Sequence, residues 1–267
     1  MNTMIVAVIS ITTIGVICAA LLSIASKVMH VAVDERILKI QEALPGSNCG
    51  ACGFPGCSGY AKALVENTNI RTNLCPPGGA EAVKQLSGIL GVEAEDVAAK
   101  YAIVHCRGDS NVLQKKMDYA GIETCMAVKQ LFGGEGACTY GCLGYGDCQA
   151  ACPSDAICME KELARISAKF CTGCGLCVKA CPNELITVES DAIATVVLCK
   201  DLEKGAVARK KCSNCCLGCG KCVRECPSAA IILEENLARI DYEKCTGCRH
   251  CSEICVTQCI QPLVTRK

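Results

Sequence analysis

The hydrophobic pattern of this chain begins with one long apolar stretch near its N-terminus. Residues 4–25 (MIVAVISITTIGVICAALLSIA) contain no charged side chain, and a helix needs about 20 apolar residues to cross a bilayer. A cleaved signal peptide normally carries lysine or arginine before its apolar region, and none precedes this stretch. We therefore predict a single transmembrane helix as an anchor over residues 1–27, in which Cys18 is a small apolar residue.

The charges that follow this stretch predict its orientation. Lys27, Arg36 and Lys39 come after the apolar residues, and positively charged flanks stay on the cytoplasmic side of a membrane. The chain is accordingly expected to contact the lipid bilayer through residues 4–25 as a single-pass protein of the inner (cytoplasmic) membrane. The rest of the chain is expected in the cytoplasm.

The second half of the chain repeats itself. The segment GCLGYGDCQAACPSDAI (141–157) matches CCLGCGKCVRECPSAAI (215–231), and residues 104–106 resemble residues 197–199. Such self-similarity indicates duplicated structural units. We predict two tandem modules, each a small α+β unit of paired short strands and two short helices.

Proline, glycine and hydrophobic periodicity divide the remaining residues. The pattern predicts a helix at 60–67, and two helices over 80–101 that are interrupted at 88–91. The expected segments are a helical linker (28–46), a four-cysteine domain (47–105), a connector (106–137), a first module (138–190), a second linker (191–211) and a second module (212–267).

Cysteine is the unusual part of the composition, with 28 residues out of 267. Disulfides and zinc are the alternatives to consider. Disulfide scaffolds rarely repeat one short spacing, and zinc sites usually join two C-x2-C pairs across a spacer. Aromatic residues make up only 3%, so bound metal would replace much of the core in small modules. The formal net charge of zero gives no indication of nucleic-acid binding.

Four runs of closely spaced cysteines, here called ladders, occupy the two modules. Bacterial ferredoxins bind [4Fe–4S] clusters with the run C-x2-C-x2-C-x3-C-P, whose fourth cysteine ligates the other cluster of the pair. Two ladders match fully, a third lacks only the proline, and one is a distorted relative. In the same order, their residues are Cys171, Cys174, Cys177 and Cys181; Cys216, Cys219, Cys222 and Cys226; Cys245, Cys248, Cys251 and Cys255; and Cys138, Cys142, Cys148 and Cys152.

The crossing of the fourth cysteine predicts which thiols share a cluster. The distorted ladder is the irregular case, because Tyr145 stands where the second module has Cys219. We expect Cys138 to replace the missing thiol, which leaves Cys212 unassigned although the two occupy matching positions. The predicted sets are Cys138, Cys142, Cys148 with Cys181; Cys171, Cys174, Cys177 with Cys152; Cys216, Cys219, Cys222 with Cys255; and Cys245, Cys248, Cys251 with Cys226.

A further set of cysteines lies before the modules, as Cys49-x2-Cys52-x4-Cys57 with Cys75 beyond it. Glycines surround these residues, which suits a backbone that folds closely around a cluster and offers N–H groups to sulfur. The prediction is one more [4Fe–4S] site, and a zinc knuckle is the alternative.

Several cysteines remain outside these sets, and burial as ordinary apolar residues is the default for each. Cys106, Cys125, Cys199 and Cys212 are alternative ligands of a further cluster. We expect about five clusters, or six if spare cysteines bind iron. No glycine-rich dinucleotide motif follows a strand and no P-loop occurs, so neither flavin nor NAD is expected on this chain. The remaining spare cysteines are Cys158, Cys215 and Cys259.

The order of these parts resembles the B subunit of Rnf-type complexes over nearly the whole chain. Those complexes are membrane ferredoxin:NAD oxidoreductases that couple electron transfer to Na⁺ or H⁺ translocation. The resemblance implies that this chain accepts electrons from soluble ferredoxin and relays them to partner subunits that carry flavin and the NAD site. Departures from a regular pattern, such as Tyr145 and Val256 after the last ladder, concern individual ligands.

The residues themselves favour electron relay, because serial cluster motifs occur without a catalytic triad or a substrate motif. A basic stretch formed by 209–211, Lys221 and Arg224 is a candidate docking surface for acidic ferredoxin, and a solvated surface is the alternative. Three other functions stay open: a carrier subunit of another membrane oxidoreductase, a catalytic subunit with its own flavin, and a protein whose clusters are structural.

Overall fold

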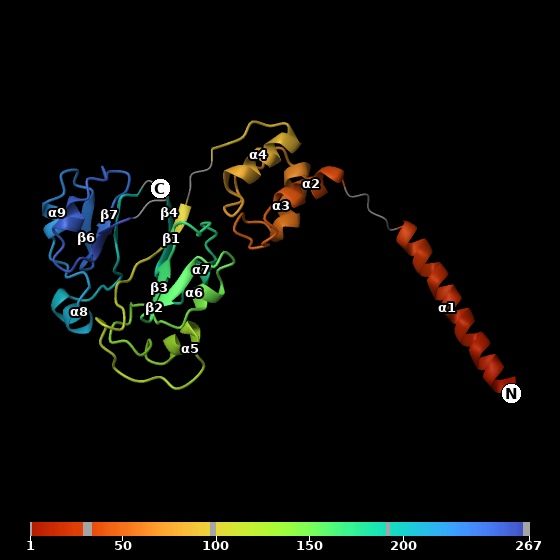
Figure 1. The fold of residues 1–267 in the computed structure, drawn as a ribbon, viewed down its shortest axis with the longest axis horizontal. Coiled ribbons are helices and arrows are strands. Elements are labelled where there is room, and N and C mark those ends of the chain that lie inside the picture. The colour runs from red at the N-terminus through yellow and green to blue at the C-terminus, as the bar shows by residue number, and fades with distance from the viewer. Residues whose placement is uncertain (1, 29–33, 97–99, 191–192, 264–267) are drawn as a thin grey trace.

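The structure is a computed structural model that describes residues 2–28, 34–96, 100–190 and 193–263. Parts of the expected linkers (29–33 and 191–192) and the last residues of the second module (264–267) lie outside these ranges. Figure 1 shows a long N-terminal helix, a small helical unit, and two modules of short strands and helices at the other end.

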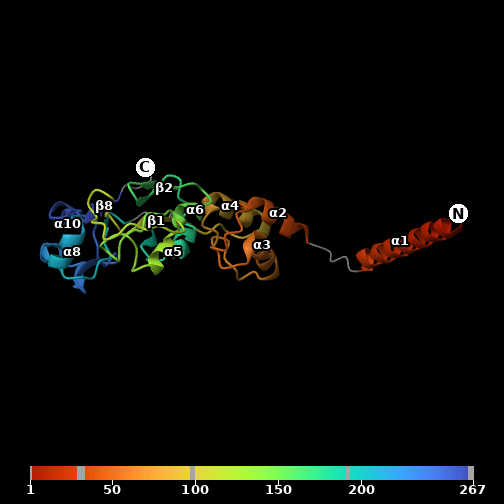
Figure 2. The same ribbon diagram turned by 90° about the horizontal axis from the view of Figure 1, so that it is seen from below.

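Helix α1 (Asn2–Val28) contains the apolar stretch. Its described side chains are exposed, including Ile11, Val16 and Leu22, and both views show the helix extending away from the other elements (Figure 2). No helix in the described parts of the chain meets the combined length and hydropathy needed to span a membrane. The transmembrane anchor is therefore not confirmed and stays a prediction.

The helical unit consists of α2 (Glu35–Ala43), α3 (Gly56–Glu66) and α4 (Gly79–Leu90). Its core includes the fully buried side chains of Ile40, Tyr60 and Leu86. Apolar residues three or four positions apart lie on one face of each helix, which explains this packing. The helices expected at 60–67 and at the start of 80–101 are thus present in outline.

The second helix expected within 80–101 is not found at residues 92–96 or 100–101, and residues 97–99 lie outside the described ranges. Helix α4 continues through Gly88 and ends at Leu90, and the next residue, Gly91, adopts the left-handed conformation (φ 70°) typical of a helix C-terminus. The chain then forms strand β1 (Lys100–Val104), whose central residues are buried. Tyrosine, isoleucine and valine in β1 favour extended backbone, and pairing with a distant strand decides the outcome.

The first module surrounds two antiparallel strand pairs. Strand β1 pairs with β4, and the hairpin β2–β3 pairs Ile157 with Ile166. Both central residues of the hairpin turn, Lys161 and Glu162, have positive φ, as in tight hairpin turns. The elements after β1 are α5 (Cys125–Gln130), α6 (Asp147–Ala150), β2 (Ile157–Glu160), β3 (Leu163–Ile166), α7 (Leu176–Ala180) and β4 (Ile186–Ser190).

The second module repeats this arrangement. Strand β5 pairs with β8, the hairpin β6–β7 pairs Ile231 with Ile240, and Glu235 and Asn236 form the same positive-φ turn. The predicted duplication is confirmed by this matching strand pairing. The elements are β5 (Thr195–Val197), α8 (Gly205–Lys211), α9 (Lys221–Arg224), β6 (Ile231–Glu234), β7 (Leu237–Ile240), α10 (His250–Glu253) and β8 (Ile260–Pro262).

Strand pairing moves two boundaries relative to the sequence-based division. Strand β1 was expected in the four-cysteine domain and β5 in the second linker, yet each pairs with the last strand of a module. The modules therefore include residues 100–104 and 195–197. The sequence alone could not show this, because both strands pair with residues far along the chain.

The two modules are in close contact. Val196 packs into the first core and its neighbour Val197 into the second, since successive side chains of a strand face opposite ways. The imidazole of His105 lies 2.8 Å from both the Val197 carbonyl and the Thr187 hydroxyl. The connector also contacts the second module through a Gln114 N–H donated to the Lys211 carbonyl at 2.9 Å. This packing brings some of the cysteines of both modules to a shared boundary.

Candidate iron–sulfur sites

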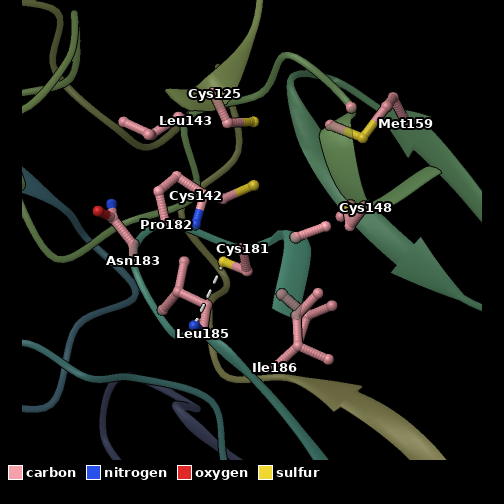
Figure 3. Close-up of a pocket in the computed structure, with 14 residues that line it drawn as sticks. Cys125, Cys142, Leu143, Cys148, Met159, Cys181, Pro182, Asn183, Leu185 and Ile186 are labelled. Atoms are coloured by element: carbon pink, nitrogen blue, oxygen red, sulfur yellow. Dashed lines mark hydrogen bonds between the residues drawn. The ribbon is translucent and has the colours of Figure 1, made fainter. Parts of the chain in front are cut away.

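Four thiols of the first module line one cavity. They belong to Cys125, Cys142, Cys148 and Cys181, and Figure 3 shows them around the same space, with apolar Leu185 and other side chains around them. Burial raises the pKa of Cys148 to about 12, with further contributions from the charges of Cys142, Cys125 and Cys181. These four thiols are close enough to act on one another electrostatically.

The expectation that Cys138 joins this set is not met. Cys138 does not line the cavity, and its Sγ lies 3.6 Å from Oδ2 of the buried Asp201 instead. Cys125 occupies the place that was expected for Cys138. Sequence spacing could not choose between them, because the missing ladder cysteine can be replaced by any thiol that the connector brings back to the module.

Cys125 is positioned by the start of α5. The carboxylate of Asp147 accepts the N–H groups of Cys125 at 2.9 Å and Met126 at 3.1 Å, which satisfies donors that a helix N-terminus leaves free. Burial raises the pKa of Cys125, and backbone hydrogen bonds from Asp147 and Tyr145 oppose that rise. The Tyr145 ring packs edge-on against Tyr119 with centroids 6.0 Å apart. The backbone of Tyr145, which stands at the position of the missing ladder cysteine, is thus close enough to Cys125 to affect its pKa.

The other set of the first module is brought together as predicted. Burial raises the pKa of Cys177 to about 11, and the charges of Cys171, Cys174 and Cys152 add to that rise. The Cys171 sulfur accepts N–H groups of Ala102 at 3.3 Å and of a neighbouring glycine at 3.4 Å. Strand β1 therefore contributes directly to this site.

The second module has a corresponding cavity. It is lined by the expected Cys216, Cys219, Cys222 and Cys255, and also by Cys259. The Cys255 and Cys259 sulfurs lie 3.7 Å apart. Hydrogen bonding to Cys259 lowers the pKa of both Cys216 and Cys255, and the same bonds raise that of Cys259. Cys259 therefore lies where its S–H can donate one hydrogen bond to a neighbouring sulfur, a contact that sequence spacing did not indicate.

The last ladder also forms its predicted set. Burial raises the pKa of Cys251, and hydrogen bonding to Thr195 opposes the rise, while the charges of Cys245, Cys248 and Cys226 contribute to it. The Cys226 sulfur accepts a backbone N–H at 3.4 Å. The thiols of each module thus fall into two groups whose members act on one another electrostatically.

The helical unit collects Cys49, Cys52, Cys57 and Cys75. Burial raises the pKa of Cys75, which also feels the charges of the other three thiols. The Asn48 side chain accepts the Cys57 N–H at 2.8 Å. The loop needs glycine beside this bond: a Cβ on residue 56 (φ 82°) would lie 2.8 Å from the Asn48 oxygen.

These sets fit [4Fe–4S] clusters by donor type and surroundings. Thiolates that bind such clusters sit in apolar pockets and accept backbone N–H groups, and both features recur here. Within the described residues, no three cysteine, histidine, aspartate or glutamate side chains are arranged to hold a single metal ion. A cubane cluster distributes its four cysteines over four irons, so its ligands need not converge on one point.

Comparison with known families agrees with this division. A family of Fe-S cluster domains matches residues 44–77. Two families described as 4Fe-4S dicluster domains match residues 170–230, and residues 135–182 with 205–256. Together with the repeated cysteine sets, these matches define an iron–sulfur electron-transfer protein built from dicluster ferredoxin-like modules.

Curated relatives extend over most of the chain. The B subunit of the Na(+)-translocating ferredoxin:NAD(+) oxidoreductase complex of Acetobacterium woodii is 39% identical over 92% of this chain and 74% of its own length. Its proton-translocating counterpart from Clostridium ljungdahlii is 39% identical over 99% and 94%. The B subunit of the ion-translocating oxidoreductase complex of Methanosarcina acetivorans is 38% identical over 93% and 94%. The chain belongs to this family, the B subunits of Rnf-type ion-translocating oxidoreductase complexes.

Proposed function

We propose that this chain accepts electrons from reduced soluble ferredoxin and relays them to partner subunits that reduce NAD⁺. The partner complex couples this transfer to Na⁺ or H⁺ translocation, as the names of the relatives describe for their own complexes. The observation that carries the proposal is the gathering of ladder thiols into repeated sets of four within contiguous modules. Each bound cluster supplies a site that takes up and releases one electron without other bond changes.

Five cysteine sets hold these clusters in the proposal. Four follow the predicted crossing of ladders and the fifth lies in the helical unit, with Cys125 in place of Cys138. The sets are Cys49, Cys52, Cys57 and Cys75; Cys125, Cys142, Cys148 and Cys181; Cys152, Cys171, Cys174 and Cys177; Cys216, Cys219, Cys222 and Cys255; and Cys226, Cys245, Cys248 and Cys251.

The exposed face beside Cys219 supports a docking surface for an acidic ferredoxin. Cys219 is exposed, as are Lys221 and Arg224 next to it, and the Arg224 guanidinium donates to the Cys219 carbonyl at 3.3 Å. Lys210 on α8 is exposed as well. Lys211 forms a 2.6 Å ion pair with Glu203, so its charge is already partnered. The docking charge therefore comes from Arg209, Lys210, Lys221 and Arg224, which steer association electrostatically.

Membrane attachment through α1 is part of the proposal. Its support is the uncharged sequence of residues 4–25 and the exposed apolar side chains along the helix, which water does not favour. The basic residues that follow support a cytoplasmic location for the modules, where soluble ferredoxin is found.

The test uses the purified complex that contains this chain. Ferredoxin-dependent reduction of NAD⁺ is compared between the complete complex and the complex stripped of this subunit, with NADH oxidation by an artificial acceptor as control. The proposal expects the ferredoxin reaction to be lost while the control reaction persists. Undiminished ferredoxin-dependent reduction without this subunit would overturn it.

A further inference from the structure

Between the two modules lies a third cysteine-lined cavity, here called the junction site. Its wall is lined by cysteines, as the walls of the two ladder cavities are. None of its cysteines belongs to the five sets above, and all are buried or half-buried. They are Cys106, Cys138, Cys199, Cys212 and Cys215.

Four of these thiols form two pairs related by the internal repeat. Cys106 and Cys138 on the first module occupy the positions of Cys199 and Cys212 on the second. Cys215 has no such counterpart, because a glycine stands at the matching position of the first module. The duplication therefore brings two equivalent thiols from each side to one boundary, and Cys215 is an additional wall residue.

Backbone N–H groups point at the junction sulfurs as they do at ladder sulfurs. The Cys106 sulfur accepts from Gly108 and from Cys142, both at 3.4 Å. The Cys199 sulfur accepts from Cys216 at 3.3 Å. Such bonds stabilise thiolates bound to clusters. Two of these donors, Cys142 and Cys216, are themselves proposed cluster ligands of the adjoining cavities. Their peptide groups therefore link the junction site to those cavities.

Gly108 keeps space open between two of the thiols. A Cβ at this residue would lie 3.4 Å from the Cys212 sulfur and 3.7 Å from the Cys106 sulfur. Any other residue would therefore fill part of the gap between them. The connector also holds the two sides together, through the bridge between Leu113 and Cys212 and an Asn214 amide donated to the Arg107 carbonyl at 3.2 Å.

We propose that Cys106, Cys138, Cys199 and Cys212 bind a sixth [4Fe–4S] cluster at the junction site. The four thiols release their protons as four Fe–Sγ bonds form to one cube. The peptide N–H groups of Cys142 and Cys216 then connect this cluster to its neighbours in both modules. The role of this cluster as an electron bridge between the modules rests on the proposed function. The binding of the cluster to the four thiols does not.

Asp201 and two cations set the charge of the site. Asp201 is 2% exposed and lies beside Cys138, while Arg107 and Lys200 line other parts of the cavity wall. A carboxylate next to a cluster disfavours the addition of an electron. The Asp201→Asn variant is therefore expected to shift the potential of one cluster upward and to leave iron content unchanged.

The test is iron and sulfide analysis of the full chain, loaded anaerobically and checked by Mössbauer and EPR spectroscopy. Wild type is expected to hold about 24 irons, and Cys106→Ala, Cys199→Ala and their double variant about 20 each, because all three remove the same cluster. Cys215→Ala is the matched control and is expected to keep about 24. The remaining cluster spectra report whether each variant is folded.

Several results would overturn the inference. A wild-type count near 20 irons would do so without any variant. So would a double variant that loses about eight irons while its other signals persist, or a Cys215→Ala variant that loses about four. Failure of the proposed function can be told apart from failure of this inference. If the chain holds the sixth cluster but ferredoxin does not reduce it, the junction site stands and the proposed function is refuted.

Discussion

Substitution of Cys125 is the sharpest test, because the structure places Cys125 in the first ladder cavity whereas the sequence pattern predicted Cys138 there. Cys125 is buried in the first ladder cavity and Cys138 is not part of it. Cys125→Ala is expected to lose one cluster, about four irons per chain, and Cys158→Ala, which alters an exposed thiol, to lose none. Iron analysis and EPR of the anaerobically loaded chain measure this loss.

A second substitution tests whether a cysteine at position 145, which corresponds to Cys219 of the second module, can replace the lost thiol. Tyr145→Cys restores the regular ladder and is expected to recover the cluster in the Cys125→Ala background. It removes an edge-on contact with Tyr119, which costs about 0.5–1.5 kcal/mol. Metal binding in structural sites contributes about 10 kcal/mol or more. This gain exceeds the cost of the lost aromatic contact, so the cluster should form again.

The same substitution separates the two candidate cysteines. Tyr145→Cys should not restore the iron lost by Cys138→Ala, because Cys138 lies at the junction site rather than in this cavity. Rescue of Cys138→Ala, or a full iron content in Cys125→Ala, would refute the reasoning from the cavity and return Cys138 to the first ladder set.

Three further predictions concern other parts of the chain. Cys259→Ala should keep every cluster but lower the potential of one by roughly 20–60 mV in a redox titration, the equivalent of one lost hydrogen bond; an unchanged potential would contradict the donor role. Lys210→Glu with Lys221→Glu should slow reduction by ferredoxin severalfold at low salt and much less at high salt, in stopped-flow measurements, and equal rates for both proteins would exclude this docking surface. Removal of residues 1–28 should release the chain from membrane vesicles into the supernatant, and continued sedimentation with vesicles would place the anchor elsewhere.

The sequence was sufficient for what depends on local spacing. The ladders and the duplication were predictable, because short cysteine spacings repeat on the same chain. The thiols of the three regular ladder sets and of the set at Cys75 lie close enough to act on one another electrostatically, and their role as cluster ligands stays a prediction.

Features that depend on contacts between distant segments were not predictable. Strand β1 was not predicted, because its pairing partner, β4, lies far along the chain. Cys125 could not be preferred over Cys138, since the path of the connector decides which thiol returns to the module. The junction site likewise combines segments from both modules, so that spacing alone left Cys106 and Cys199 as spare residues.

The central claim is that this chain conducts electrons through several clusters, and an electron count tests it most directly. The loaded full-length chain is titrated anaerobically with reduced soluble ferredoxin, and cluster absorbance and EPR signals are followed to the end point. Conduction through serial clusters predicts uptake of about five to six electrons per chain, one for each cluster, at low potential. Uptake of none, or of a single electron with the other clusters silent, would contradict the relay.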